Sequence, residues 1–148
     1  MQSAERTVQE VMSSESRYIK HDTTIEQAAK LMSDIDSGFL PISDEDERKL
    51  VGVVTDRDIV VRALAEGKKP GDTPVIDCKS DKVLYCYQNQ PLSEAVASMQ
   101  KQQVWRLVVL DNDSDKNLAG IISVGDIMRA GEYEKAKAVA KDIEDAAA

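Results

Sequence analysis

The sequence predicts a mixed α and β fold made from two copies of one strand–helix–strand–strand–helix unit. The first observation is an internal repeat, in which residues 24–32 (TIEQAAKLM) are matched by residues 91–99 (PLSEAVASM). Further along, residues 50–59 (LVGVVTDRDI) are matched by residues 118–127 (LAGIISVGDI). Because the two copies are in register, any site built on the unit should exist twice or lie between the copies.

Length, charge and cysteine content narrow the class of protein. The chain has 148 residues, and its 19 basic and 27 acidic residues give a net charge of −8, which argues against a nucleic-acid partner. Each copy has about 60 residues, which is marginal for a core of its own, so the copies should pack together. No apolar stretch has the length of a membrane span, and the N-terminus lacks a signal-peptide core. The two cysteines do not form a disulfide framework, so we expect a reduced, cytoplasmic protein.

The first copy opens with a short apolar strand at residues 18–19 and continues into an amphipathic helix. Thr23 is expected to cap this helix, with Glu26 three residues later completing a capping box. The helix has one apolar face, made by Ile25, Ala28, Ala29 and Met32. Apolar runs at 39–42 and 50–54 flank an acidic turn, which predicts a hairpin. A second helix should start near Asp56.

The second copy follows the same order. It has a strand at 83–87, a helix with Pro91 at its first position, a hairpin of 106–110 with 118–122, and a helix from near Val124. The expected organisation is copy one at 8–66, a linker with glycines and prolines at 67–82, copy two at 83–131 and a tail at 132–148. The Ala-, Lys- and Glu-rich tail should form an exposed or partner-facing helix.

The repeated unit ends in the pattern G-h-h-[ST]-x-x-D-h, where h is apolar, at residues 52–59 and 120–127. With its companion segments 38–42 and 104–109, it resembles a cystathionine-β-synthase (CBS) domain pair. The resemblance covers roughly residues 8 to 131. No enzymatic or membrane domain accompanies the two copies, so the chain resembles a stand-alone CBS pair.

The resemblance implies a fold of two β-α-β-β-α motifs related by a pseudo-two-fold axis. It also implies a non-enzymatic regulatory module that binds AMP, ADP, ATP or S-adenosylmethionine in clefts between the copies and requires no cofactor. In such proteins the motif Asp binds ribose hydroxyls and the Ser or Thr binds phosphate. Carried over, these roles fall on Thr55 and Asp58 in one cleft and on Ser123 and Asp126 in the other.

A basic side chain should distinguish the two clefts. Arg106 stands where many CBS proteins carry a phosphate-binding Arg, whereas the first copy has Phe39 there. Independently of the family, Thr55 and Ser123 precede predicted helix N-termini, which favour phosphate. The resemblance further implies a homodimer.

Other readings of these residues stay open. The spacing [ST]-x-x-D is also a capping box, and a carboxylate bonded back to its cap is less available to a ribose. If capping is its whole role, the chain is a ligand-free dimeric scaffold that docks onto an unidentified partner protein. Phosphate binding is an alternative for Arg57 and Arg62, but we expect them to be surface or dimer contacts. Trp105 is expected to pack rather than stack on adenine.

Metal and catalytic chemistry are not expected. Residues 111–117 (DNDSDKN) share the start of a calcium loop, but Lys116 replaces the required Gly and Ile122 the required Glu, which leaves a solvated turn. His21 is the only histidine, which excludes a multi-histidine metal site or a His-based triad within one chain. No nucleophile is paired with a base, so the sequence does not predict an enzyme.

Overall fold

The computed structural model describes residues 5–13, 18–80 and 82–147, and the chain forms two compact units. Unit 2 spans Arg17–Val83, and unit 1 combines the chain from Leu84 onward with the N-terminal residues before Arg17. Each unit is described by itself below.

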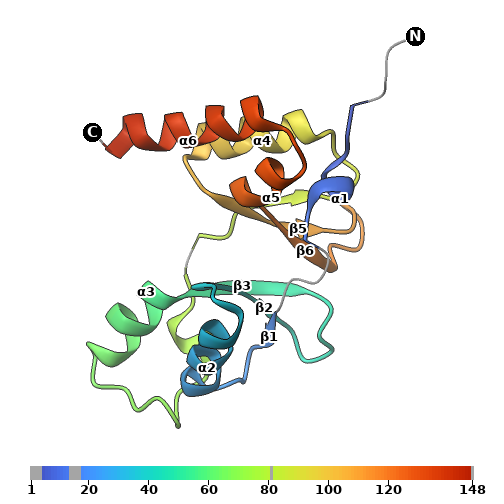
Figure 1. The fold of residues 1–148 in the computed structure, drawn as a ribbon. Helices are drawn as coiled ribbons and strands as arrows, with labels where there is room; N and C mark the ends of the chain where they lie inside the picture. The colour runs from blue at the N-terminus through green and yellow to red at the C-terminus, as the bar shows by residue number, and fades with distance from the viewer. Residues whose placement is uncertain (1–4, 14–17, 81, 148) are drawn as a thin grey trace. The chain divides into compact units, whose positions relative to one another are not determined.

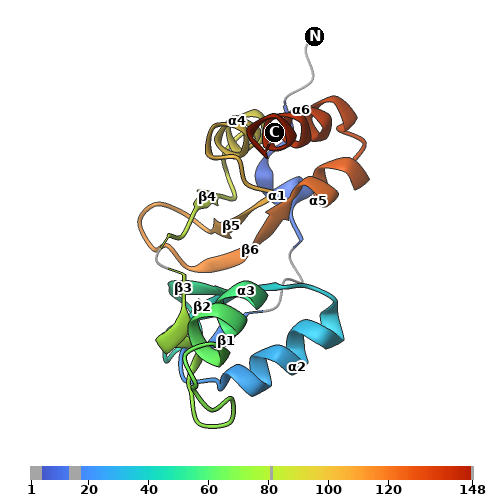
Figure 2. The same cartoon turned by 90° about the vertical axis from the view of Figure 1, so that its left-hand side faces the viewer.

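Unit 2 contains one three-stranded sheet with helices on one of its faces (Figures 1 and 2). Its elements are β1 (Ile19–Lys20), α2 (Ile25–Ile35), β2 (Phe39–Ser43), β3 (Leu50–Thr55), α3 (Asp56–Asp58), the π-helix η1 (Ile59–Leu64) and the 3-10 helix η2 (Val75–Cys78). The sheet order is β1-β2-β3, with β1 parallel and β3 antiparallel to β2. The buried side chains include Ile25, Leu40, Ile42, Val54 and Val75.

Unit 1 repeats this arrangement and adds two helices. Its elements are α1 (Val8–Val11), β4 (Tyr85–Tyr87), α4 (Leu92–Gln102), β5 (Arg106–Leu110), β6 (Leu118–Ser123), α5 (Val124–Arg129) and α6 (Tyr133–Ala147). The order β4-β5-β6 again has a parallel and then an antiparallel pair. Figure 1 shows α4, α5 and α6 on one face of this sheet. The mixed fold with two repeated motifs and both hairpins is therefore confirmed.

Each unit is completed by an eight-residue segment that comes before the first strand of the other unit in the chain. We call these two segments, residues 6–13 and 73–80, the leading segments. They make matching hydrogen bonds. The Ser13 amide donates to the Ile121 carbonyl at 2.9 Å, and the Ser80 amide donates to the Val53 carbonyl at 2.8 Å. Residues 6–13, most of which fall in the range predicted for copy one (8–66), thus belong to the unit that holds copy two, and residues 73–80, which come before copy two, belong to the unit that holds copy one.

The leading segments also fill the two cores. Val8 and Val11 are buried in unit 1, and Val75 and Cys78 are buried in unit 2. Residues 73–80 lie inside the range that the sequence suggests is a linker, yet they are an integral part of unit 2. Local periodicity does not reveal this, because it does not show which sheet a short segment joins.

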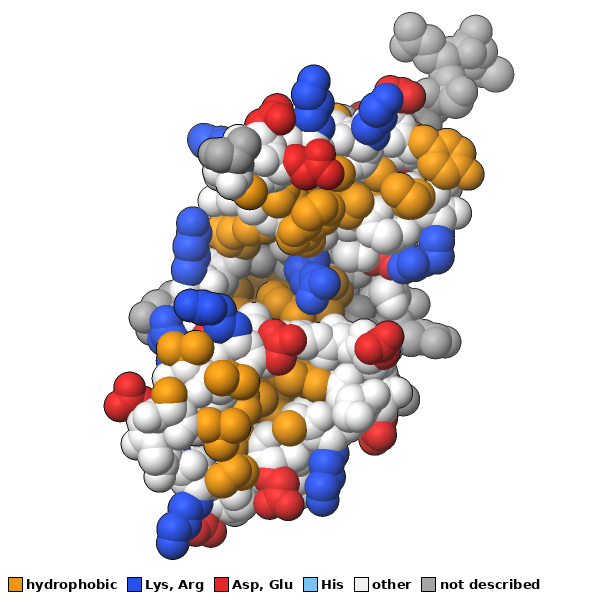
Figure 3. Space-filling model, turned by 60° about the vertical axis from the view of Figure 1, so that its left-hand side comes forward, with side chains coloured by type: hydrophobic (Ala, Val, Ile, Leu, Met, Phe, Trp, Pro, Cys, Tyr) orange, Lys and Arg blue, Asp and Glu red, His pale blue; other side chains and the backbone are white. Residues whose placement is uncertain are grey.

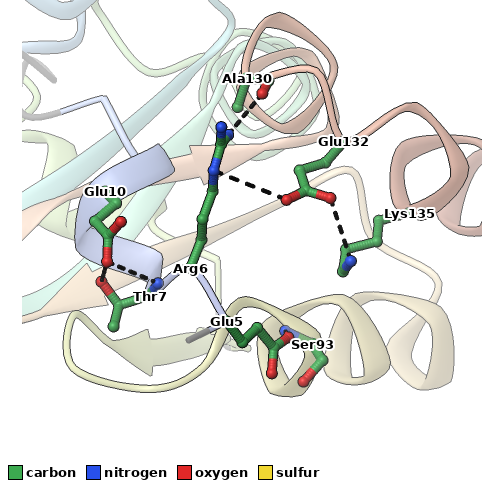
Figure 4. A network of polar contacts seen from close by, with 8 residues as sticks. All are labelled: Glu5, Arg6, Thr7, Glu10, Ser93, Ala130, Glu132 and Lys135. Atoms are coloured by element: carbon green, nitrogen blue, oxygen red, sulfur yellow. Dashed lines mark hydrogen bonds and ion pairs between the residues drawn. The ribbon is translucent and has the colours of Figure 1, made fainter. Parts of the chain in front are cut away.

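Charged side chains attach residues 5–13 to both ends of the helical layer of unit 1 (Figure 4). The Glu5 carboxylate accepts from the Ser93 amide at 2.8 Å, at the start of α4, and this bonding to Ser93 lowers the pKa of Glu5. Arg6 donates to the carbonyl of Ala130, which follows α5, at 2.6 Å, and lies 3.9 Å from the Glu132 carboxylate. The anion therefore lies at a helix N-terminus and the cation at a helix C-terminus, which is the favourable arrangement for both helix dipoles.

The C-terminal tail forms α6, and this helix packs within its own unit instead of being exposed throughout. Ala136 and Val139 are fully buried against the α4 and α5 layer. Gln100 of α4 donates to the Asp142 carboxylate at 3.0 Å. The outer face of α6 carries charged residues, as its amphipathic sequence requires.

Three local predictions are corrected by one residue or by helix type. Helix α2 is capped by Thr24 with Gln27, instead of Thr23 with Glu26. Both threonines fit the pattern, but the Thr23 amide bonds back to Lys20 in a turn. Pro91 is the N-cap of α4 instead of its first helical residue. The helix expected after Asp56 continues as the π-helix η1.

Two repeat-equivalent glycines test how tightly the leading segments are seated. A Cβ on Gly120 would lie 2.5 Å from the Ser13 carbonyl oxygen, which is backbone, whereas one on Gly52 would meet the flexible Lys79 side chain at 2.8 Å. We expect Gly120→Ala to lower the free energy of unfolding by about 1–3 kcal/mol. Gly52→Ala, the matched control, should cost clearly less. Equal losses in urea titrations of the two variants would contradict this seating of residues 5–13.

Candidate functional site

Both repeat motifs form complete capping boxes. In unit 2 the Thr55 hydroxyl accepts from the Asp58 amide at 3.1 Å, and the Asp58 carboxylate accepts from the Thr55 amide at 2.9 Å. In unit 1, Ser123 and Asp126 make the same pair of bonds at 3.1 and 2.9 Å. The capping reading of [ST]-x-x-D is therefore confirmed for both copies. Each box uses one oxygen of its carboxylate and leaves the other to different partners.

Sheet register brings a third predicted residue to each motif. Arg106 is the direct cross-strand partner of Ser123, and Phe39 is the direct partner of Thr55. Directly paired residues of an antiparallel sheet project from the same face with Cβ atoms about 5 Å apart. The structure thus gathers Arg106, Ser123 and Asp126 at one end of β6, and it places Phe39 at the equivalent position of unit 2.

An arginine lies beside the free oxygen of each motif carboxylate. Arg129 donates to Asp126 Oδ1 at 2.7 Å, and Arg62 Nε lies 3.5 Å from Asp58 Oδ1. The two carboxylates are almost buried, with side chains 10% and 9% exposed. Arg129 was not predicted, and Arg62 was expected as a surface or dimer contact, with phosphate binding as the less favoured alternative. Their spacing from the Asp, three residues in one copy and four in the other, hides their equivalence in the sequence.

Unit 2 differs from unit 1 in the charge next to its motif. Asp56 stands where unit 1 has the buried Val124, and its carboxylate lies over Gly38 so closely that a Cβ there would overlap it. Unit 1 has Trp105 in place of Gly38, and this side chain is 46% exposed instead of packed in the core. The unit 1 site has a net positive charge, from two arginines (Arg106 and Arg129) and one aspartate (Asp126). In unit 2 the charges cancel, because two aspartates (Asp56 and Asp58) stand against two arginines (Arg57 and Arg62).

The arrangement in unit 1 suits a phosphorylated sugar. A carboxylate accepts hydrogen bonds from vicinal hydroxyls, and guanidinium groups bind phosphate oxygens with charge-assisted bonds. Among the described residues of the site, no nucleophilic side chain is paired with a base. The contacts that the site offers are binding contacts.

The remaining candidates are structural. Within residues 5–13, 18–80 and 82–147, no three His, Cys, Asp or Glu side chains are grouped to hold a metal ion. In the 111–117 turn the Asp111 carboxylate accepts from the amides of Asn112 and Asn117, so it organises the hairpin. His21 bonds to Glu45 at 2.9 Å. Cys78 and Cys86 are buried free thiols, and burial raises the pKa of Cys86 to about 12.

A family model for the CBS domain matches residues 8–64 and 75–133, which is most of the chain. The chain belongs to the CBS domain family. The second match begins at residue 75, close to the start of the leading segment 73–80. No helix of the described chain has the length and hydrophobicity that crossing a bilayer requires.

Several known proteins resemble most of the chain. The uncharacterized protein YlbB of Bacillus subtilis is 31% identical over 137 residues, covering 92% of this chain and 90% of YlbB. Hypoxic response protein 1 of Mycobacterium tuberculosis is 33% identical over 123 residues, covering 83% of each chain. A crystal structure of Hypoxic Response Protein I with two coordinated zinc ions has a TM-score of 0.73 at 30% identity, covering 84% of this chain and 98% of that one.

Adenosine compounds are bound in a solved CBS pair that resembles this chain. The CBS domain pair of protein MJ0100, in complex with 5-methylthioadenosine and S-adenosyl-L-methionine, has a TM-score of 0.71 at 26% identity. It covers 88% of this chain and 99% of that chain. Binding of adenosine-type ligands therefore occurs among structural neighbours of this protein.

The capping role of Asp126 gives a stability prediction that needs no ligand. Asp126→Ala removes the acceptor of the Ser123 amide and should lower the free energy of unfolding by about 1 kcal/mol. Asp126→Asn keeps an acceptor, and the Arg129 ion pair is exposed on the arginine side, so this variant should stay within about 0.5 kcal/mol of wild type. The exposed Asp145→Ala is the control. Chemical denaturation measures all three, and an unchanged Asp126→Ala would contradict the capping contribution.

Proposed function

We propose that this CBS pair is a non-enzymatic, cytoplasmic regulatory module that binds an adenosine-containing ligand such as AMP, ADP, ATP or S-adenosylmethionine. The observation that carries the proposal is the grouping of Arg106, Ser123 and Asp126 at the end of β6 in unit 1. In this proposal Asp126 accepts from the ribose hydroxyls, and Ser123 and Arg106 bind phosphate. The adenosine compounds bound by the MJ0100 pair support the ligand class.

Thr55 and Asp58 form the corresponding second site in unit 2. Phe39 replaces the phosphate-binding cation there, and Asp56 adds a negative charge. The second site is therefore proposed to disfavour phosphorylated ligands relative to the first. No cofactor is required in either site.

The ligand class is tested by calorimetry with adenosine, AMP, ADP, ATP and S-adenosylmethionine. Wild type should bind at least one of them, and Asp126→Asn should lower that affinity about tenfold or more, because the amide makes weaker bonds to the diol than the carboxylate. Unchanged affinity of Asp126→Asn for every compound that binds wild type would return Asp126 to capping alone.

Arg106 separates phosphate recognition from recognition of the nucleoside. Arg106→Ala should weaken AMP binding by about 1–3 kcal/mol and leave adenosine binding nearly unchanged, since a hydrogen bond to a charged group is lost only for the phosphate. Arg48→Ala, a substitution at an exposed arginine of the β2–β3 turn, is the control. Equal losses for AMP and adenosine would rule out the phosphate role.

The second candidate function is a ligand-free dimeric scaffold that docks onto an effector protein. It is favoured by the exposed apolar residues of η1, where Val60, Val61 and Leu64 are 56%, 44% and 49% exposed. Figure 3 shows hydrophobic side chains gathered on this face of unit 2. If no adenosine compound binds wild type, this scaffold function is the one that remains.

Both functions include a homodimer, and the η1 surface is the proposed contact. We expect light scattering at micromolar concentration to give the dimer mass. Val61→Glu should shift the protein toward monomer, because it buries a charge in an apolar contact. Val51→Glu, at an exposed valine of β3, should not. A monomeric wild type would overturn the dimer proposal.

A further inference from the structure

The carboxylate of Asp58 is occupied more fully than the capping box requires. Its Oδ2 accepts from the Thr55 amide at 2.9 Å and also from the Ser80 hydroxyl at 2.6 Å. Its Oδ1 faces the Arg62 guanidinium, with Nε at 3.5 Å. Asp58 as a whole is only 7% exposed. Both oxygens of Asp126 also have partners in Ser123 and Arg129, so Asp58 is distinguished by the additional Ser80 hydroxyl on Oδ2.

Arg62 and Ser80 connect Asp58 to the leading segment 73–80. A terminal nitrogen of Arg62 donates to the Lys79 carbonyl at 3.1 Å, and the Ser80 amide donates to the Val53 carbonyl of β3 at 2.8 Å. Residues 79 and 80 are thus attached by one backbone bond and by two side-chain contacts that converge on Asp58. Two of these contacts involve an ion, which makes them stronger than neutral hydrogen bonds.

Arg62 lies in the π-helix η1, one helical turn after Asp58. In unit 1 the arginine follows the carboxylate by three residues in an ordinary α-helix, and in unit 2 it follows by four. Arg62 lies within the wide turn that the bond from the Ala65 amide to the Val60 carbonyl closes. Single π-turns are rare and occur frequently at functional sites. Arg62 is 44% exposed and holds the leading segment, whereas Arg129 is 74% exposed.

We propose that Ser80 and Arg62 are the residues that decide ligand occupancy in unit 2, by holding Asp58 closed against a ribose. The inference rests on the proposed function of ligand binding. The Thr55–Asp58 site binds a nucleoside only when the ribose diol displaces the Ser80 hydroxyl from Asp58 Oδ2. Binding there releases residues 79–80 from Asp58, next to the point at which the chain leaves unit 2. The Ser123–Asp126 site of unit 1 fills first, and occupancy of unit 2 is coupled to the state of the leading segment.

The competition gives an unusual expectation, since removing a polar side chain near the site should improve binding. In calorimetry with adenosine as the probe, wild type should show one tight site per chain. Ser80→Ala should raise the affinity of the second site at least about tenfold, the value of one hydrogen bond to a charged group. Ser80→Thr keeps the hydroxyl and should behave as wild type. Ser33→Ala, an exposed serine on α2 of the same unit, is the matched control.

A second measurement uses the protein without any ligand. Hydrogen exchange of the Ser80 amide, which is bonded to Val53, should be at least about tenfold faster in Ser80→Ala and in Arg62→Gln than in wild type or in Ser33→Ala. The Asp126 box of unit 1 should keep its protection in all four proteins. This reading checks that the variants are folded and that only the attachment of residues 79–80 has loosened.

The outcomes separate this inference from the proposed function. If wild type binds adenosine at one site and Ser80→Ala binds it identically, the occupancy role is wrong while ligand sensing stands. If wild type and Ser80→Ala bind no adenosine compound, the proposed function fails and the occupancy role fails with it. Two equal sites in wild type would also overturn the inference. Faster exchange together with a new second site in Ser80→Ala supports it.

Discussion

Each small sheet of this protein depends on a segment from outside its own strand–helix–strand–strand–helix motif. A unit of about 60 residues has a thin core, and a few buried side chains decide whether it is stable. In unit 1, Val8 and Val11 supply part of that core, and in unit 2, Val75 and Cys78 do so. The same backbone bond at Ser13 and at Ser80 attaches each segment to the last strand of its sheet. In unit 2 the motif carboxylate of Asp58 is also bonded to the segment, through the Ser80 hydroxyl.

This constraint explains why the two copies could diverge at the motif without losing the fold. The capping boxes, the hairpin registers and the leading-segment bonds are the same in both units. What differs is the chemistry beside the motif: Phe39 against Arg106, and the Asp56 carboxylate against the buried Val124. One unit therefore presents a cationic site, and the other holds its carboxylate in contacts with its own chain.

The parts of the fold that could be predicted are those encoded by a local or repeated pattern of residues in the sequence. Apolar runs on either side of polar turns gave both hairpins, and apolar spacing gave α2 and α4 to within a residue. The leading segments were missed because residues 6–13 and 73–80 share little beyond Val8 with Val75 and Ser13 with Ser80. Their pairing is also long-range, which no local pattern records. The π-turn of η1 has no sequence signature, and so the equivalence of Arg62 and Arg129 became visible only in three dimensions.

The site residues illustrate the same limit in energetic terms. A motif of Ser or Thr with Asp three residues later can cap a helix or bind a sugar, and the sequence cannot rank the two roles. The structure shows that capping uses only one oxygen of the carboxylate. Capping is worth about 1 kcal/mol, so it restrains the side chain without saturating its acceptors. Neighbouring side chains then contact the second oxygen and the remaining lone pairs. In unit 1 the neighbour is the exposed Arg129, and in unit 2 the neighbours are Ser80 and the less exposed Arg62. The balance between these neighbours and a ligand diol, rather than the motif itself, determines which copy can act as a sensor.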